Sequence, residues 1–241
     1  MPRSSSKSTL KTLISTRDAV DYSLRRAFVD EFMGTQVKQL SSDLHVLDVG
    51  GKRSGHRGGF TINDYSLKTT ILNIASGDRP HILADAAHLP ILAESFEAAI
   101  CAETLEHVSM PPDVLAEIQR ALKPGGILLV TVPFNFRIHG DPHDYGRYTD
   151  HYWREQLVRQ GFEIQLISKQ GLFWSVLVDM LRDVAYQALL DGQPKYTWLR
   201  RLIARGIRLV KRKAIDWDAK IPPDSRLSQY TTGFGIVALR T

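Results

Sequence analysis

Cysteine, long apolar runs and acidic residues near both ends are scarce in this sequence of 241 residues. The one cysteine, Cys101, cannot form an internal disulfide, so a reducing, cytoplasmic compartment is expected. Cys101 lies in an apolar stretch, which favours a buried hydrophobic role over that of a nucleophile. No apolar run approaches the roughly 18 residues of a membrane span, and the N-terminus lacks the apolar centre of a secretory signal.

Acidic residues are absent from residues 1–17 and from residues 200–213, although the formal net charge of the whole chain is only +5. A local excess of this kind indicates contact with an anionic surface, and no nucleic-acid partner is expected. Residues 198–213 combine an apolar stripe with seven basic residues. This amphipathic pattern is typical of a packed helix with a solvated basic face, or of peripheral contact with an anionic membrane.

Hydrophobic periodicity predicts strands that alternate with helices, and therefore an α/β fold built on a mostly parallel sheet with helices on both faces. We expect a flexible tail over residues 1–15 and one domain over residues 16–241, with a helical insertion at 172–230. A helix is predicted over residues 16–40, with Thr16 as its N-cap. The other expected helices span 111–122, 149–160, 172–190 and 198–213, and the expected strands span 44–49, 68–74, 81–84, 96–102, 127–132, 162–168 and 232–240.

The first expected strand runs into a glycine-bearing loop, so that residues 46–55 form a candidate nucleotide site at the carboxyl end of a strand. Glycines let the chain turn sharply and let a ligand approach the backbone closely. Gly50 and Gly55 fit the outer positions of a G-x-G-x-x-G fingerprint, whereas Lys52 occupies the middle position. That departure counts against a dinucleotide site, because Lys52 would crowd the pyrophosphate.

Five further segments follow in order: DAAHLP at residues 85–90, SFE at 95–97, LEH at 105–107, EIQRALKPGG at 117–126 and VP at 132–133. With the VLDVG loop at 46–50, this series resembles the Rossmann-like small-molecule methyltransferases that use S-adenosylmethionine. The resemblance covers residues 46–161 and the closing strand with Gly233 and Gly235. It implies a seven-stranded doubly wound sheet with an antiparallel last strand, and methyl transfer from S-adenosylmethionine.

The resemblance also implies cofactor contacts, residue by residue. Asp48 and Gly50 match positions at the methionine half of the cofactor, and Gly51 and Gly55 would let the chain pass close to it. Asp85 matches the carboxylate that binds the adenine amino group, with the Ala86 N–H facing the ring, unless Asp85 only caps a turn. Glu103 matches a position at the pocket floor. Asn73 stands where the family usually has an acid that grips the ribose hydroxyls, and Asp78 is a candidate substitute.

Residues 133–149 follow the fifth strand and are rich in His, Asp, Tyr and Arg, as expected of a segment that binds a polar acceptor. Similar segments occur in a subset of these methyltransferases in cell-envelope contexts, which implies a glycan-type acceptor. His139 and His143 are candidate bases for a hydroxyl acceptor, with Asp144 orienting one of them. Alternatively, Asp144 and Arg147 form a structural ion pair. No metal ion is expected.

The sequence therefore predicts an S-adenosylmethionine-dependent enzyme that methylates a small or glycan-type acceptor at oxygen. Two alternatives stay open. The chain could be a methyltransferase-like binding protein without catalysis, because Asn73 and the pair Lys52 and Arg53 depart from the family pattern. It could also be a nicotinamide-dependent oxidoreductase, which Lys52 in the glycine loop disfavours.

Overall fold

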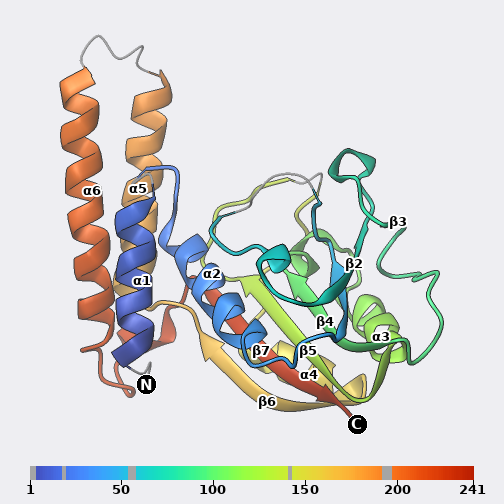
Figure 1. The fold of residues 1–241 in the computed structure, drawn as a ribbon. Helices are drawn as coiled ribbons and strands as arrows, with labels where there is room; N and C mark the ends of the chain where they lie inside the picture. The colour runs from blue at the N-terminus through green and yellow to red at the C-terminus, as the bar shows by residue number, and fades with distance from the viewer. Residues whose placement is uncertain (1–3, 18–19, 54–57, 141–142, 192–196) are drawn as a thin grey trace. The chain divides into compact units, whose positions relative to one another are not determined.

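The computed structural model describes residues 4–17, 20–53, 58–140, 143–191 and 197–241, shown as a coloured ribbon in Figure 1. The chain divides into two compact units. The first, here called the sheet unit, contains residues 32–168 and 234–241. The second, the helical unit, contains residues 1–31 and 169–233.

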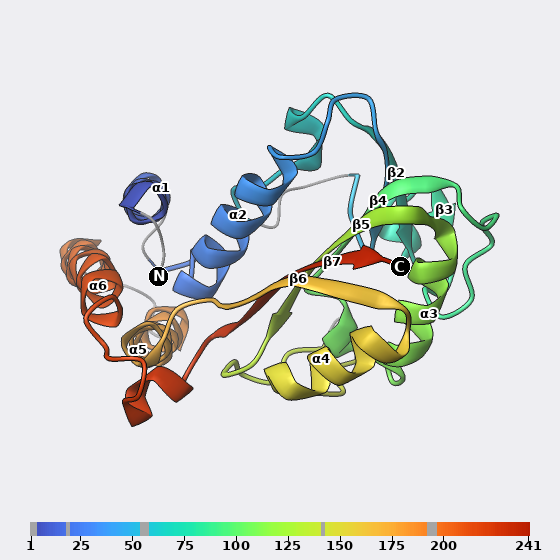
Figure 2. The ribbon, with the colours of Figure 1, turned by 90° about the horizontal axis from the view of Figure 1, so that it is seen from below.

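Seven strands of the described chain form one sheet in the order β3-β2-β1-β4-β5-β7-β6. Strand β1 pairs in parallel with β2 and β4, β2 pairs in parallel with β3, and β4 pairs in parallel with β5. Strand β7 lies between β5 and β6 and runs antiparallel to them (Figure 2). The predicted fold class is thus confirmed. The strands are β1 His45–Val49, β2 Lys68–Asn73, β3 Ile82–Leu83, β4 Phe96–Ala102, β5 Leu122–Pro133, β6 Phe162–Lys169 and β7 Gly233–Arg240.

Apolar side chains cover both faces of the sheet, as a parallel sheet requires. Helices α3 (Pro111–Ala121) and α4 (Asp150–Arg159) lie along one face (Figure 2). On that side Leu47 and Val49 of β1 join one buried cluster with Leu115 of α3. The preceding residue, Val46, is equally buried but points to the other face, since side chains alternate along a strand.

The KPGG segment at residues 123–126 lies inside β5, although the expected strand begins only at residue 127. Phe96 of β4 pairs with Leu122, and Ala98 pairs with Ile127, so β5 advances five residues while β4 advances two. The extra residues bulge out of the ladder, and Gly125 takes a φ of +75° there. The segment is the bulged start of a strand instead of a simple connecting turn.

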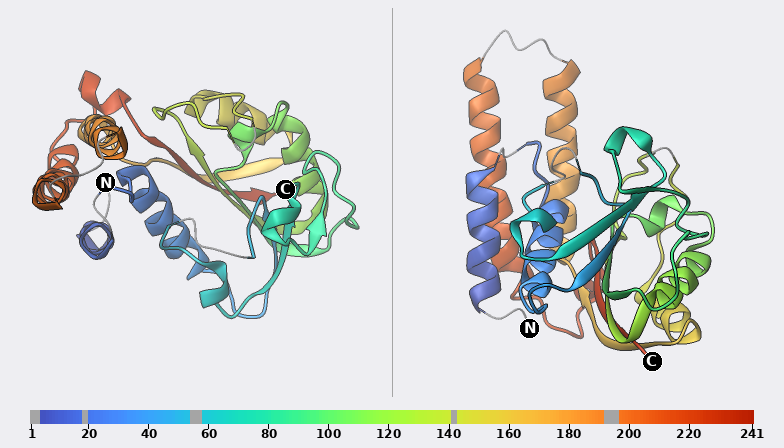
Figure 3. Two further views of the ribbon diagram at one scale, coloured as in Figure 1. Left: turned by 90° about the horizontal axis from the view of Figure 1, so that it is seen from above. Right: turned by 45° about the vertical axis from the view of Figure 1, so that its right-hand side comes forward.

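The helical unit contains α1 (Ser4–Thr16), the start of α2 (Leu24–Val37), α5 (Phe173–Asp191) and α6 (Thr197–Asp218), and the last two run side by side (Figure 3). Its buried cluster includes Leu10 and Ile14 of α1 and Ala214 of α6. The prediction of a flexible tail is therefore wrong for the described part of residues 1–15. Composition alone suggested disorder, whereas Leu10 and Ile14, one turn apart, bring an apolar face of the helix into this cluster.

A single helix over residues 16–40 is also a wrong prediction, because α1 ends at Thr16 and α2 begins at Leu24. Thr16 does not cap a following helix: its hydroxyl donates back to Thr12 O, 3.0 Å away. The start of α2 is stabilised by Asp179 instead, whose carboxylate accepts from the backbone N–H groups of Leu24 and Arg25 at 2.7 Å each. Among the described residues, none of the helices has the length and hydrophobicity that a membrane crossing requires.

Candidate functional site

The loop after β1 turns at Gly50, which adopts a φ of +80° and donates from its N–H to Leu72 O at 2.8 Å. A Cβ at this position would lie 2.3 Å from the hydroxyl oxygen of Thr104. That hydroxyl in turn donates to Val49 O at 3.2 Å and so ties the loop after β4 to the end of β1. Gly50 is therefore required both by backbone conformation and by the close approach of Thr104.

The Asp48 carboxylate packs directly against Gly51 of this loop. A Cβ on Gly51 would lie 2.1 Å from Asp48 Oδ2, so only glycine fits above the carboxylate. Burial raises the pKa of Asp48 to about 7, because a low-dielectric environment disfavours the charged form. Asp48 and Gly51 do not line the cavity described below, whereas Gly50, which stands between them in the sequence, does. The predicted contact residue Gly55 lies outside the described residues.

Asn73, at the end of β2, is almost fully buried and holds the glycine loop. Its Nδ2 donates to Gly51 O at 2.9 Å and to Gly50 O at 3.2 Å. Its Oδ1 accepts from the N–H of Ala75 at 2.9 Å. Both ends of the amide are thus engaged by the backbone, which gives Asn73 a scaffolding role at the position where a ribose-binding acid was expected.

The Asp78 carboxylate lies beside Lys52 and the Asn73 amide. Its Oδ1 lies 3.0 Å from Lys52 Nζ, and its Oδ2 lies 3.4 Å from Asn73 Nδ2. The Lys52 charge in the glycine loop is therefore compensated by Asp78, and both side chains remain partly accessible. This pairing reduces the repulsion that the Lys52 charge would exert on a cationic ligand.

A cavity of about 490 Å³ opens where the loops after β1, β2, β3 and β4 meet. This is the carboxyl edge of the parallel strands, where ligands of open α/β sheets bind. Five of the predicted cofactor residues line it: Gly50, Asn73, Asp85, Ala86 and Glu103. The volume lies within the range of small-molecule sites.

Hydrogen bonds fix the chain at Asp85 and at Glu103, two residues of the cavity wall. Asp85 Oδ1 accepts from the N–H of Ala87 at 2.9 Å, so the carboxylate does cap its own turn while it also borders the cavity. Glu103 has a φ of +51°, a left-handed conformation that is unusual for a residue with a side chain. Its N–H donates to Thr131 O at 2.8 Å, which holds this conformation at the end of β4.

The segment after β5 folds over the short 3₁₀ helix η3 (Leu105–His107) and completes the cavity with His143 and Tyr145. The N–H of Tyr145 donates to Glu106 O at 2.8 Å. His107, which sequence analysis did not select, also lines the cavity, and its Nδ1 lies 2.6 Å from His143 O. The available signal was its position as the last residue of the LEH motif, shortly after the expected strand 96–102.

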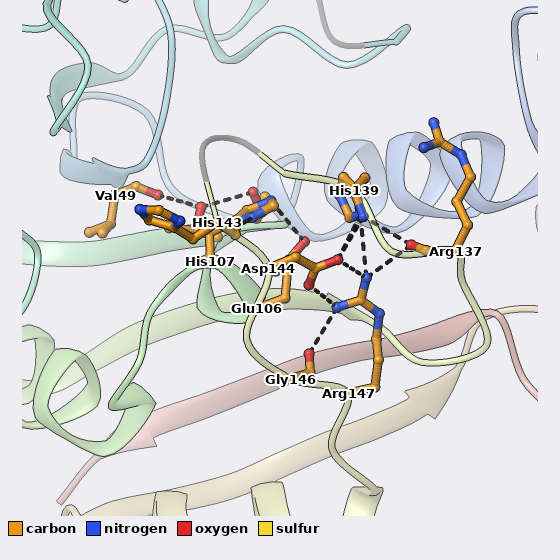
Figure 4. Close-up of polar contacts among 11 residues, drawn as sticks. Val49, Glu106, His107, Arg137, His139, His143, Asp144, Gly146 and Arg147 are labelled. Atoms are coloured by element: carbon orange, nitrogen blue, oxygen red, sulfur yellow. Dashed lines mark hydrogen bonds and ion pairs between the residues drawn. The ribbon is translucent and has the colours of Figure 1, made fainter.

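His139 and Asp144 stand behind this wall and do not line the cavity. The Asp144 carboxylate lies between His139 and Arg147 (Figure 4). Its Oδ2 accepts from the N–H of His139 at 2.8 Å and from Arg147 Nη2 at 2.7 Å. The hydrogen bonds from Arg147 lower the pKa of Asp144 to about 2. Asp144 thus forms the ion pair with Arg147 and also contacts His139, and a catalytic role for His139 stays a prediction.

Burial also shifts the pKa values of His139 and Cys101. Burial is the main cause that lowers the pKa of His139, and the neighbouring His107 lowers it further. Cys101 is free and fully buried near the carboxyl end of β4, and burial raises the pKa of its thiol. The expected hydrophobic role of Cys101 is confirmed.

Residues 57–130 match a family model described as a methyltransferase domain. Comparison with curated proteins gives no match. Among solved structures, the [4+2]-cyclase SpnF is 20% identical, with coverage of 89% of this chain and 80% of that one and a TM-score of 0.56.

Two other solved structures carry a cofactor or its product. Phosphoethanolamine N-methyltransferase 2 of Haemonchus contortus, in complex with S-adenosyl-L-methionine, is 15% identical, with coverage of 86% of this chain and 51% of that one and a TM-score of 0.54. Geranyl diphosphate C-methyltransferase of Streptomyces coelicolor A3(2), in complex with Mg²⁺, geranyl diphosphate and S-adenosyl-L-homocysteine, is 13% identical, with coverage of 88% and 79% and a TM-score of 0.52. At these identities the likeness concerns the fold, which hosts different chemistries.

Proposed function

We propose that this chain, whose residues 57–130 match the methyltransferase domain model, transfers a methyl group from S-adenosylmethionine to the oxygen of a small or glycan-type acceptor. The observation that carries the proposal is the cavity at the carboxyl edge of the sheet, in which five residues with expected cofactor roles come together. The resemblance to Rossmann-like methyltransferases is confirmed by the family model, and the acceptor is the new element of the proposal.

Gly50 would hold the methionine half of the cofactor, and Asp85 and Ala86 would hold its adenine. Asp78 takes over the ribose hydroxyls, since the Asn73 amide is occupied by loop carbonyls. A carboxylate can accept hydrogen bonds from both hydroxyls with charge-assisted strength. Asp78 borders the cavity, as this role requires.

The acceptor approaches from the side of His107, His143 and Tyr145. Methyl transfer is an in-line displacement, so the chain must align the acceptor oxygen with the sulfonium methyl and exclude water. A hydroxyl acceptor also loses a proton, and His143 borders the cavity while His139 does not. We therefore assign the base to His143, and give positioning roles to His139 and Asp144. The dense polar side chains of this segment support a sugar-like acceptor.

Differential thermal stability with ligands tests the cofactor class. S-adenosylhomocysteine should raise the melting temperature, whereas NAD⁺ and NADH should not, and the reverse pattern would favour the oxidoreductase alternative. His143→Ala should keep the stabilisation by S-adenosylhomocysteine and lose methyl transfer to any acceptor that the wild type methylates. A wild type that binds the cofactor but transfers no methyl group to a panel of glycans and small alcohols would favour a binding protein.

Helix α6 supports a second proposal, peripheral contact with an anionic membrane through residues 198–213. Leu202 and Leu209 are 59% and 61% exposed, and Arg205 and Arg212 are exposed as well. Against this, Val210 packs on the helical cluster, and Lys211 is buried with its Nζ donating to Tyr22 O at 2.5 Å. Flotation with phosphatidylserine vesicles at low salt tests the contact. Retention that Leu202→Ser and Leu209→Ser abolish would support it, and no retention would remove it.

A further inference from the structure

Glu106, His107 and His139 bring one carboxylate and two imidazoles together beside the cavity. One ligand-capable atom from each residue lies within 4.8 Å of the others. Glu106 Oε1 is 3.7 Å from His107 Nε2, and the imidazole rings of His107 and His139 meet edge to face at 5.0 Å between centroids. No metal is expected from the sequence, in which His107 and His139 lie in separate segments. The two residues meet in the structure because the segment after β5 folds over η3.

The tautomer of His107 follows from its surroundings. Its Nδ1 lies 2.6 Å from His143 O, and a carbonyl oxygen only accepts, so Nδ1 carries the proton. The Nε2 lone pair then faces the Glu106 carboxylate group. A histidine whose other ring nitrogen donates to a backbone carbonyl is the usual arrangement of a metal ligand.

His139 is held in the same way. Its Nδ1 lies 3.3 Å from both Arg137 O and Asp144 Oδ2. Arg147 Nη2 is also 3.3 Å away, but its hydrogens serve the shorter bonds to Asp144 Oδ2 and Arg137 O, at 2.7 and 3.1 Å. Nδ1 of His139 therefore donates to an oxygen, and its Nε2 keeps a lone pair. The pair of Asp144 and Arg147 thus acts as the support behind a ligand.

We propose that Glu106, His107 and His139 bind one divalent first-row transition-metal ion through a carboxylate oxygen and two imidazole nitrogens. Two neutral imidazoles and a carboxylate suit Zn²⁺, Fe²⁺ or Mn²⁺, whereas Mg²⁺ and Ca²⁺ prefer oxygen ligands throughout. The Glu106 side chain is only 1% exposed, and a bound cation offsets the cost of burying its charge. Three protein ligands leave coordination positions for a substrate oxygen.

The metal's place next to the cavity suggests what it does, and this role rests on the proposed methyl transfer. His107 lines the cavity on the acceptor side, so an acceptor hydroxyl can reach the ion. Coordination lowers the pKa of that hydroxyl. The hydroxyl proton passes to the base, and the oxygen forms a bond to the methyl carbon. The bond between the methyl carbon and sulfur breaks, its electron pair stays on sulfur, and S-adenosylhomocysteine is the product.

Titration calorimetry of the tag-free, EDTA-treated full chain with ZnCl₂, MnCl₂ and MgCl₂ tests the site without any cofactor present. We expect one Zn²⁺ or Mn²⁺ per chain, weak or absent Mg²⁺ binding, and at least a tenfold loss of affinity in Glu106→Gln, His107→Ala and His139→Ala. His151→Ala is the matched control, since His151 is an exposed histidine on α4. The Zn²⁺ affinity of this variant should equal that of the wild type. Zn²⁺ binding that all three variants retain would overturn the proposal.

A second readout uses the wild type alone, so that a variant that fails to fold leaves the proposal testable. The imidazole proton resonances of His107 and His139 should shift on addition of one equivalent of Zn²⁺, whereas that of His151 should not. Unshifted resonances of His107 and His139 would overturn the site. Because S-adenosylhomocysteine binding is measured separately, failure of the metal site and failure of the proposed function are distinguishable.

Discussion

Lys52 Nζ and Asp78 Oδ1 lie 3.0 Å apart at the rim of the cavity, so that the unusual cation of the glycine loop meets the carboxylate that follows β2. With the Asn73 amide bound to the loop backbone, Asp78 is the acid available near the expected ribose position. In the proposed function, Asp78 therefore compensates for both departures from the family pattern.

The first prediction concerns this pair. Asp78→Asn should weaken binding of S-adenosylhomocysteine by about 10- to 100-fold, since a charge-assisted hydrogen bond contributes about 1.5–3 kcal/mol. Lys52→Ala removes the partner and keeps the carboxylate, so it should change the affinity by much less. Calorimetry on both variants checks this, and equal affinities of Asp78→Asn and the wild type would remove Asp78 from the site.

The second prediction concerns Gly50. Gly50→Ala should destabilise the fold by about 2–5 kcal/mol, the sum of the left-handed backbone and the collision with Thr104. Gly125→Ala is the matched control, because Gly125 has a φ of +75° but a Cβ there would meet nothing within 4 Å; it should cost about 1–2 kcal/mol. Urea denaturation measures both. Adding Thr104→Ala to Gly50→Ala should recover part of the loss, and no recovery would contradict the collision.

The third prediction uses the raised pKa of Asp48. Because the folded-state pKa is about 7 and the usual value is 3.8, ionisation of Asp48 destabilises the fold progressively as the pH rises from about 4 through 7. Asp48→Asn should therefore be more stable than the wild type at pH 8, by about 1–4 kcal/mol, with the difference vanishing near pH 4. The lower part of this range is expected, since Asp48 is partly accessible. Asp224→Asn, at an exposed position, should show no such trend.

The fourth prediction concerns Asp144, whose ionisation stabilises the fold, whereas that of Asp48 destabilises it. Asp144 has its pKa lowered to about 2, so its stabilising effect is present above about pH 4 and is lost as the pH falls towards 2. Asp144→Asn should be less stable than the wild type at pH 7 by about 1–3 kcal/mol, and the difference should shrink in acid. Chemical denaturation at several pH values measures the difference, and a gap that is constant with pH would contradict an ionised Asp144.

The strands could be predicted from the sequence where they are continuous apolar runs, because burial on both faces leaves a local signature. Strand β4 has the predicted bounds, Phe96–Ala102, and Gly50 and Asp85 were found from motif order. Contacts between distant segments leave no such signature. The pairing of Lys52 with Asp78 and the meeting of His107 with His139 depend on how loops fold over one another. Helix α1 was missed because its Ser- and Lys-rich composition hides the two residues that dock it.

Titration calorimetry of the wild-type chain with S-adenosylhomocysteine tests the central claim most directly. We predict binding of one ligand per chain, weakened by Asp85→Ala and less so by Asp85→Asn, which can keep the turn to Ala87 but lacks the charge. No binding at millimolar ligand would contradict the assignment of this cavity as a cofactor site and with it the proposed methyl transfer.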